Sequence, residues 1–107
     1  MPILSKLSPK AWIVFNPTTG AIIDSVNVSS ISGTGGDVTI NWDADFANDN
    51  YVVVATGQNY GTLLEIFEYS SKVAGSVHIR CFTATSSANT TKVATSPVNV
   101  SVVAFGE

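Results

Sequence analysis

Apolar residues occupy every second position through much of this chain. The segments 37–42 (DVTINW) and 75–81 (GSVHIRC) show the pattern most clearly. A period of two cannot form an apolar stripe along a helix, but it places the apolar side chains of a strand on one face. The pattern therefore predicts half-buried β-strands from end to end, and we expect almost no helix.

Turn residues divide the alternating segments into separate strands. Pro17 and Gly20 predict a turn, and the glycine-rich segment 32–37 predicts a hairpin. Seven or eight strands at this spacing predict an all-β fold, a compact antiparallel sandwich or barrel-like domain. The expected strands are 10–15, 21–28, 38–42, 51–56, 62–69, 77–85 and 98–105.

Several positions carry finer expectations. The continuous apolar run 51–56 predicts a central strand that is buried on both faces. Trp12 and Trp42 lie in alternating apolar segments, so we expect both in the core, with stacking on sugar rings as the alternative. Asp24 falls on the apolar face of its strand, which predicts that this strand is bent or half exposed. The segment 62–69 could form a helical turn, but its aromatic residues favour a strand.

Length and charge indicate one domain that is partly covered by a neighbour. The chain has 107 residues, which predicts a single domain over residues 10–107 after a lead-in arm, 1–9, that contains Pro2 and Pro9. Charged residues make up 12%, well below the ~25% usual for soluble domains. We therefore expect another subunit or a larger assembly to cover part of the surface.

The same composition argues against several classes of protein. The basic residues are scattered, so nucleic-acid binding is not expected. No apolar run approaches the ~20 residues of a membrane-spanning helix, so membrane insertion is not expected. Cys81 is the single cysteine, and we expect it to act as a small buried apolar residue in a protein made in a reducing cytoplasm. The basic residues are Lys6, Lys10, Lys72, Arg80 and Lys92.

No catalytic or metal-binding constellation stands out, so we predict a protein that is not an enzyme and has no cofactor or metal. His78 is the only histidine, and it should point away from the core, at a sheet face or subunit contact, with receptor contact as the alternative. The carboxylates of 43–49 match turn chemistry, with glycoside hydrolysis as the sharper alternative. Residues 43–50 fail the EF-hand pattern, which leaves only an irregular calcium site as an alternative.

The best candidates for receptor contact are polar or aromatic residues in predicted loops. Tyr60 lies in a loop beside Gly61, where an aromatic side chain has little structural purpose. The contact candidates are Gln58, Asn59, Tyr60, Asn89, Thr90 and Lys92.

Four segments resemble the compact β-domain at the distal end of bacteriophage tail fibres and tailspikes. Residues 10–15 (KAWIVF) are similar to the Lys-Ala-Trp-Val-x-Phe opening of that family. Residues 22–42, which include the GTGGD turn, residues 44–54 and the closing strand 99–105 also resemble it. The chain departs from the family at Pro17, which interrupts the usual Gly-rich turn, and at Trp42, where phenylalanine is more common.

The resemblance implies a homotrimer on the surface of a tailed bacteriophage, made in the host cytoplasm. Its expected partners are its own copies, other virion proteins and a host-surface glycan or protein. A capsid decoration or cement protein, or a separate head-fibre piece, is the alternative, favoured by the short chain that begins with Met1. A cellular carbohydrate-binding module is the third hypothesis.

Overall fold

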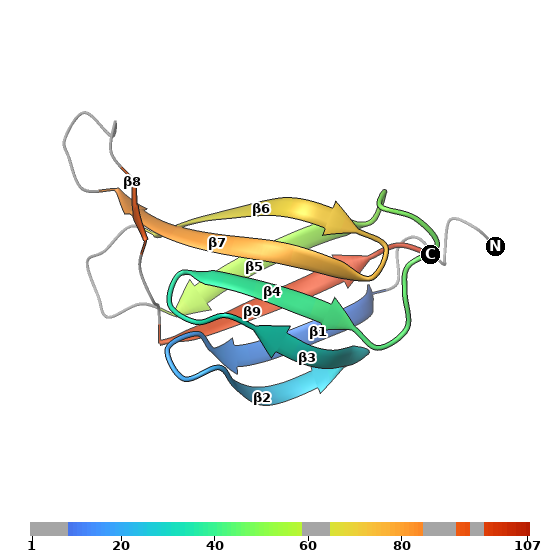
Figure 1. Ribbon diagram of the computed structural model, residues 1–107, viewed down its shortest axis with the longest axis horizontal. Helices are drawn as coiled ribbons and strands as arrows, with labels where there is room; N and C mark the ends of the chain where they lie inside the picture. The colour runs from blue at the N-terminus through green and yellow to red at the C-terminus, as the bar shows by residue number, and fades with distance from the viewer. Residues whose placement is uncertain (1–8, 59–64, 85–91, 95–97) are drawn as a thin grey trace.

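The chain folds into two antiparallel β-sheets that pack face to face (Figure 1). The computed structural model describes residues 9–58, 65–84, 92–94 and 98–107, which contain nine strands and no helix. The predicted all-β antiparallel class is therefore confirmed. The strands are β1 (Pro9–Asn16), β2 (Ala21–Val26), β3 (Val28–Ser32), β4 (Asp37–Trp42), β5 (Val52–Gln58), β6 (Glu65–Val73), β7 (Ser76–Ala84), β8 (Lys92–Ala94) and β9 (Asn99–Phe105).

Each sheet is built from strands that are distant in sequence. Sheet A has the order β2-β1-β9-β5, and sheet B has the order β3-β4-β7-β6. The short β8 also pairs with β7, through Phe82 and Ala94, while β6 pairs with the same part of β7 through Ile66. Since β6 occupies one side of β7 there, β8 lies on the side that β4 occupies further along.

Alternate residues of both sheets fill the space between them. Ile13 of sheet A and Ile40 and Val77 of sheet B have no exposed surface. Burial of such side chains contributes roughly 1.5–3 kcal/mol each relative to exposure. The predicted β3–β4 hairpin is present, with Ile31 opposite Ile40. The core residues are Ala11, Ile13, Phe15, Val38, Ile40, Trp42, Phe46, Tyr51, Val77, Ile79, Val100, Val102 and Ala104.

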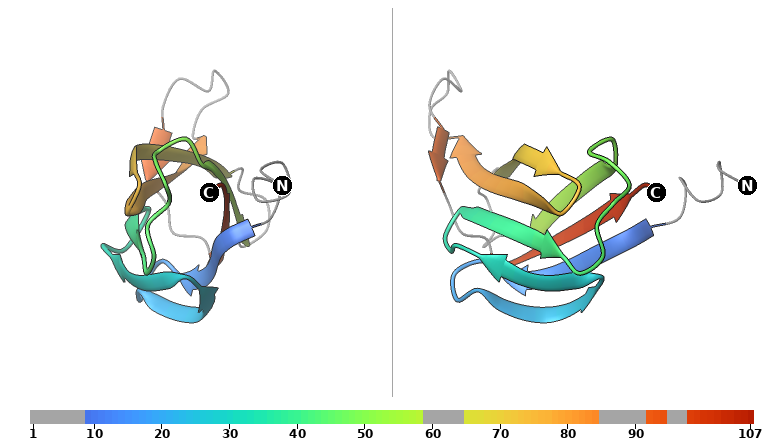
Figure 2. Two further views of the ribbon diagram at one scale, coloured as in Figure 1. Left: turned by 90° about the vertical axis from the view of Figure 1, so that its right-hand side faces the viewer. Right: turned by 45° about the vertical axis from the view of Figure 1, so that its right-hand side comes forward.

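The chain passes from sheet A to sheet B at Asn27 (Figure 2). Asn27 has a φ of 59°, and the single strand predicted over 21–28 is in fact all of β2 followed by the first residue of β3. Its side-chain oxygen accepts a hydrogen bond from the Ala44 amide (2.6 Å), and its amide nitrogen donates to the Ala44 carbonyl (3.0 Å). Asparagine tolerates the left-handed conformation better than most residues. The corner is therefore stabilised both by backbone preference and by two hydrogen bonds.

The prediction that residues 51–56 form a central strand buried on both faces is wrong. Within the described residues, β5 is an edge strand that pairs with β9 alone, and Val52 and Val54 are 58% and 47% exposed. Tyr51 is in the core, and of the β5 side chains Val53 and Ala55 pack against it. The central strands of sheet A are β1 and β9 instead. An apolar run predicts burial on both faces only if both faces are covered within the same chain, and here one is not.

The two tryptophans have different surroundings. Trp42 is 4% exposed and lies in the core as predicted. The core assignment of Trp12 is wrong, because Ala11 and Ile13 point inward and the alternation of β1 turns Trp12 to the outer face of sheet A. Asp24 is exposed, in agreement with the prediction that its strand is bent or half exposed, because β2 lies at the edge of sheet A. Residues 65–73 form a strand rather than a helical turn.

The corner at Asn27 gives a first prediction. We expect Asn27→Ala to lower the free energy of unfolding by about 2–3 kcal/mol, because it removes two hydrogen bonds and keeps the strained φ. Asn27→Gly loses the same hydrogen bonds but relieves the backbone, so it should cost about 1 kcal/mol less. Urea denaturation of both variants measures the difference. Equal losses of stability would show that backbone conformation at this corner contributes nothing.

Candidate interaction surfaces

Two of the predicted receptor-contact residues, Gln58 and Lys92, lie in described strands. Gln58 is exposed at the end of β5, and its carbonyl accepts a hydrogen bond from the Val98 amide (2.7 Å). The end of β5 and strand β8, where Lys92 lies, are at the same end of the molecule (Figure 1). The side chain of Lys92 and all of Asn59, Tyr60, Asn89 and Thr90 lie outside the described residues, so their role stays a prediction.

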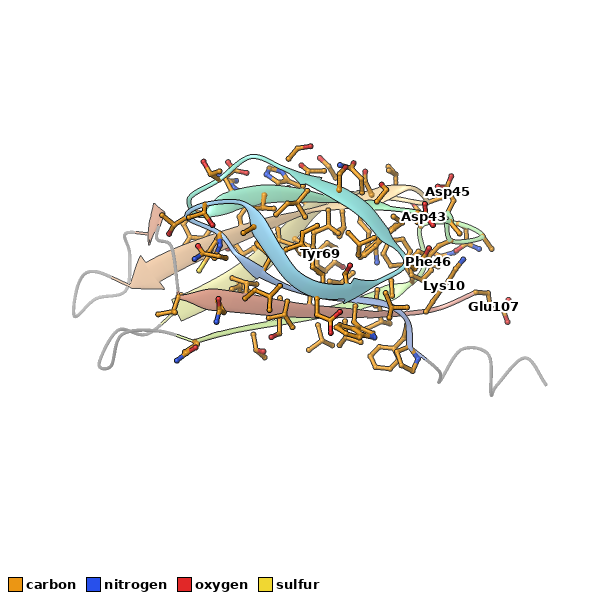
Figure 3. The ribbon with its side chains drawn as sticks, turned by 90° about the horizontal axis from the view of Figure 1, so that it is seen from below. Lys10, Asp43, Asp45, Phe46, Tyr69 and Glu107 are labelled. Atoms are coloured by element: carbon orange, nitrogen blue, oxygen red, sulfur yellow. The ribbon has the colours of Figure 1, made fainter. Side chains whose placement is uncertain are left out.

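An aromatic cluster closes the opposite end, where the C-terminus lies (Figure 3). The rings of Phe46 and Tyr51 stack at 3.9 Å, and Trp42 meets both edge to face. Lys10 places its ammonium group 4.6 Å from the centre of the Phe46 ring. Gly106 allows close packing here, since an added Cβ would lie 2.7 Å from Cβ of Tyr51. A hollow of about 270 Å³ lies beside this plug, and Glu107 is the acidic residue that lines it. Its lining residues are Asn48, Asn50, Tyr51, Val52, Phe105, Gly106 and Glu107.

Tyr51 provides the polar contacts of this plug. The indole nitrogen of Trp42 donates to the Tyr51 hydroxyl (3.1 Å), which lies 2.7 Å and 2.9 Å from the carbonyls of Val73 and Ser76 and donates to one of them at a time. Burial raises the pKa of Tyr51 above its ordinary value of 10.0; the hydrogen bond with Trp42 lowers this pKa, and Asp49 raises it. These contacts join β4, β6 and β7 to the segment that leads into β5.

The outer face of sheet B is polar and internally hydrogen-bonded. Nδ1 of His78 lies 3.0 Å from the Ser70 hydroxyl, and Nε2 contacts the carboxylate of Asp37. Asn41 donates from its side chain to the hydroxyls of Ser30 and Ser32. His78 therefore points away from the core, as predicted. This face satisfies its own polar groups and can remain in water.

The Asp37–His78–Ser70 chain has the residue types of a nucleophilic triad, but it lacks the rest of such a site. In a serine hydrolase the imidazole is held by the carboxylate through Nδ1 and activates the hydroxyl through Nε2, the reverse of the arrangement here. The three residues lie across strands β4, β7 and β6 of an open face. None of them lines the hollow beside Tyr51 (about 270 Å³), the groove on the outside of sheet A (about 210 Å³) or the small cavity beside Phe15 (about 10 Å³). The contacts of His78 with Asp37 and Ser70 therefore hold these three side chains in place on the outer face of sheet B.

The acidic residues do not gather into a site. Asp43, Asp45 and Asp49 are all exposed in the connection between β4 and β5. Within the described ranges, no group of three or more His, Cys, Asp or Glu side chains is arranged to hold a metal ion. Asn48 instead forms a local turn by accepting the Asn50 amide (2.8 Å), as expected for a turn-rich segment.

The outer face of sheet A is apolar, and this is the surface that sequence reasoning missed. Val26, Trp12, Val103 and Val54 stand side by side in one row across all four strands. Phe105 and Val52 form the neighbouring row toward the C-terminal end. A shallow groove of about 210 Å³ follows the middle of the face. Its lining residues are Trp12, Ile13, Val14, Val54, Thr56, Ser101, Val102 and Val103.

A signal for this face was present in the sequence. Residues 11–15, 52–55 and 102–105 are uninterrupted apolar runs, so both faces of those strands carry apolar side chains. The inward set fills the core between the sheets. The outward set forms an apolar surface on sheet A, whereas the outward set of β4 and β7 is polar except for Phe82, whose ring Arg80 covers. We name the residues Trp12, Val14, Val26, Val52, Val54, Val103 and Phe105 the apolar patch.

Comparison with known protein families, with curated proteins and with solved structures finds no match for this chain. The described residues also form no helix that could cross a membrane.

The plug at Tyr51 predicts a specific loss of stability at high pH. The unfolded chain ionises this tyrosine near pH 10, while the folded protein keeps it protonated to higher pH. Above about pH 10 the unfolded state binds fewer protons, so the free energy of unfolding falls as pH rises. Tyr51→Phe should cost about 1–3 kcal/mol at pH 7, because Trp42 loses its buried acceptor, and should show a shallower decline above pH 10.

Chemical denaturation at several pH values between about 9 and 11 measures this difference. The control is Tyr69→Phe, which removes a hydroxyl from a side chain that is 54% exposed and should change stability at pH 7 by less than about 0.5 kcal/mol. Parallel pH curves for Tyr51→Phe and the wild type would show that ionisation of Tyr51 is not coupled to unfolding.

Proposed function

We propose that this chain is a structural virion protein of a tailed bacteriophage, a trimeric fibre or tail-tip domain that attaches to the host surface. The observation that carries this proposal is the contrast between the two outer faces. Sheet A presents an apolar patch that includes Trp12, Val26 and Val54, whereas sheet B presents a hydrogen-bonded polar face. A small domain with this contrast suits packing into an assembly. The resemblance of its strands and turns to fibre-tip domains supports the same proposal.

Attachment in this proposal depends on several weak contacts rather than on one deep site. The ends of β5 and β8 lie together at the end of the sandwich opposite the aromatic plug (Figure 1). The connections that carry Asn59, Tyr60, Asn89 and Thr90 begin at the ends of β5 and β7 and form the proposed contact region. Three copies on one trimer would raise the avidity without any single site binding tightly.

A capsid decoration protein is the second proposal, because the apolar patch could equally seat each copy on a particle. The polar face of sheet B would then be turned outward. Immunogold labelling of intact virions separates the two proposals. Label on the tail fibre or tip supports attachment, and label over the capsid exterior supports decoration.

A carbohydrate-binding module is the third proposal, and one observation supports it. Burial of both tryptophans would have argued against sugar stacking, but only Trp42 is buried, and Trp12 lies half-exposed on the outer face of sheet A. Such a module would bind glycans as a monomer. Loss of glycan binding by monomeric Trp12→Ala protein would favour this role over the first two.

The attachment proposal predicts that loss of Tyr60 weakens binding to cells. Fluorescently labelled protein should bind the host bacterium, and Tyr60→Ala should reduce the bound fraction at least about tenfold, because exposed aromatic residues dominate many interfaces. Flow cytometry measures the bound fraction, and circular dichroism checks that both proteins are folded.

The matched control is Tyr69→Ala, which removes an exposed tyrosine of β6. We expect this variant to bind cells like the wild type. Wild-type binding by Tyr60→Ala would exclude this loop from the contact. Absence of binding by the wild-type protein at micromolar concentration would contradict attachment itself.

A further inference from the structure

We propose that the apolar patch on sheet A is covered by a second copy of this chain. The inference rests on the proposed function only in requiring that copies of the chain associate. It assigns the surface of contact, and it places Trp12, Val54 and Val103 at the centre of that contact.

The chemistry of the patch selects a partner of the same kind. Each of its seven side chains is apolar. The row that contains Val14 also carries Asp24 on β2 at the rim, and Ser101 and Thr56 beside the groove. Nucleic acid or an anionic lipid headgroup would require cations, and a glycan would require clustered hydrogen-bonding groups. The same face of another copy matches it and leaves no buried charge unpaired.

The exposed edge of β5 provides a second, independent observation. β5 pairs with β9 in unbroken register from Val52 to Gln58, and it carries no charge, proline or bulge. The edge strands β2, β3 and β6 are each interrupted by a register irregularity; β2 also carries Asp24, and β6 carries Glu68 and Lys72. The remaining edge strand, β8, has only three residues and carries Lys92. Proteins use bulges and charges to keep free strand edges from pairing. An unprotected edge beside an apolar patch is expected where another chain covers it.

The size of the patch sets the expected strength of association. Four strands ~4.8 Å apart, over about five residues of ~3.3 Å each, span roughly 300 Å². This is comparable with the largest functional patches on monomers, about 300–600 Å², and smaller than the ~800 Å² that each partner contributes to a stable interface. The patch alone therefore supports concentration-dependent association, which hydrogen bonds at the β5 edge would strengthen.

The experiment measures assembly of the full chain by analytical ultracentrifugation from low to high micromolar concentration. Val54→Lys places a charge in the middle of the patch at a position that is 47% exposed, so the subunit fold should tolerate it. We expect it to raise the concentration of half-assembly about tenfold or more. The control is Ser30→Lys, an exposed position on the outer face of sheet B, which should assemble like the wild type.

Tryptophan fluorescence reports on the surface directly. Trp42 is buried within each copy, so a concentration-dependent fall in acrylamide quenching reports on Trp12. Assembly with protection of Trp12, both lost in Val54→Lys and kept in Ser30→Lys, supports the inference. A wild-type protein that stays monomeric, or an assembly that Val54→Lys leaves intact, overturns it. Assembly without binding to cells contradicts only the attachment proposal. Cell binding by a monomer contradicts this inference and the proposed trimer, but leaves attachment to the host surface standing.

Discussion

The alternation of side chains along β1 is the constraint on which the rest of this structure depends. Residues 11–15 are all apolar, and a strand must send neighbouring side chains to opposite faces. Ala11, Ile13 and Phe15 enter the core, so Trp12 and Val14 must face outward. β9 and β5 repeat the arrangement beside it. The chain cannot fill its core from these strands without creating an apolar surface on the outside of sheet A.

This constraint makes the two sheets unlike in their relation to solvent. The outer face of sheet B carries polar side chains that are hydrogen-bonded to one another, such as His78 with Ser70 and Asn41 with Ser32. The outer face of sheet A carries valine and aromatic side chains around Trp12. Since apolar surface is favourably removed from water, the free energy of association is available on one side of the molecule only. If copies assemble through sheet A as proposed, the low content of charged residues and this asymmetry have a common physical explanation.

The sequence was sufficient for the fold class, the hairpin at 32–37 and most strand positions, because periodicity and turn residues act locally. It could not reveal which apolar positions lie inside, since a run such as 52–55 looks the same whether a strand is covered by its own chain or by another. This is why Trp12 and β5 were assigned wrongly. The corner at Asn27 depends on hydrogen bonds to Ala44, seventeen residues away, which no local pattern contains.

The most direct test of the central claim, that another copy covers the outside of sheet A, is hydrogen exchange of the β5 backbone amides as a function of protein concentration. In an isolated copy, the amides of β5 that point away from β9 should exchange freely, because no strand among the described residues pairs with them. The account predicts that these amides gain protection as concentration rises, while those at the free edge of β3 do not. Exchange of the β5 amides at one rate across all concentrations would contradict it.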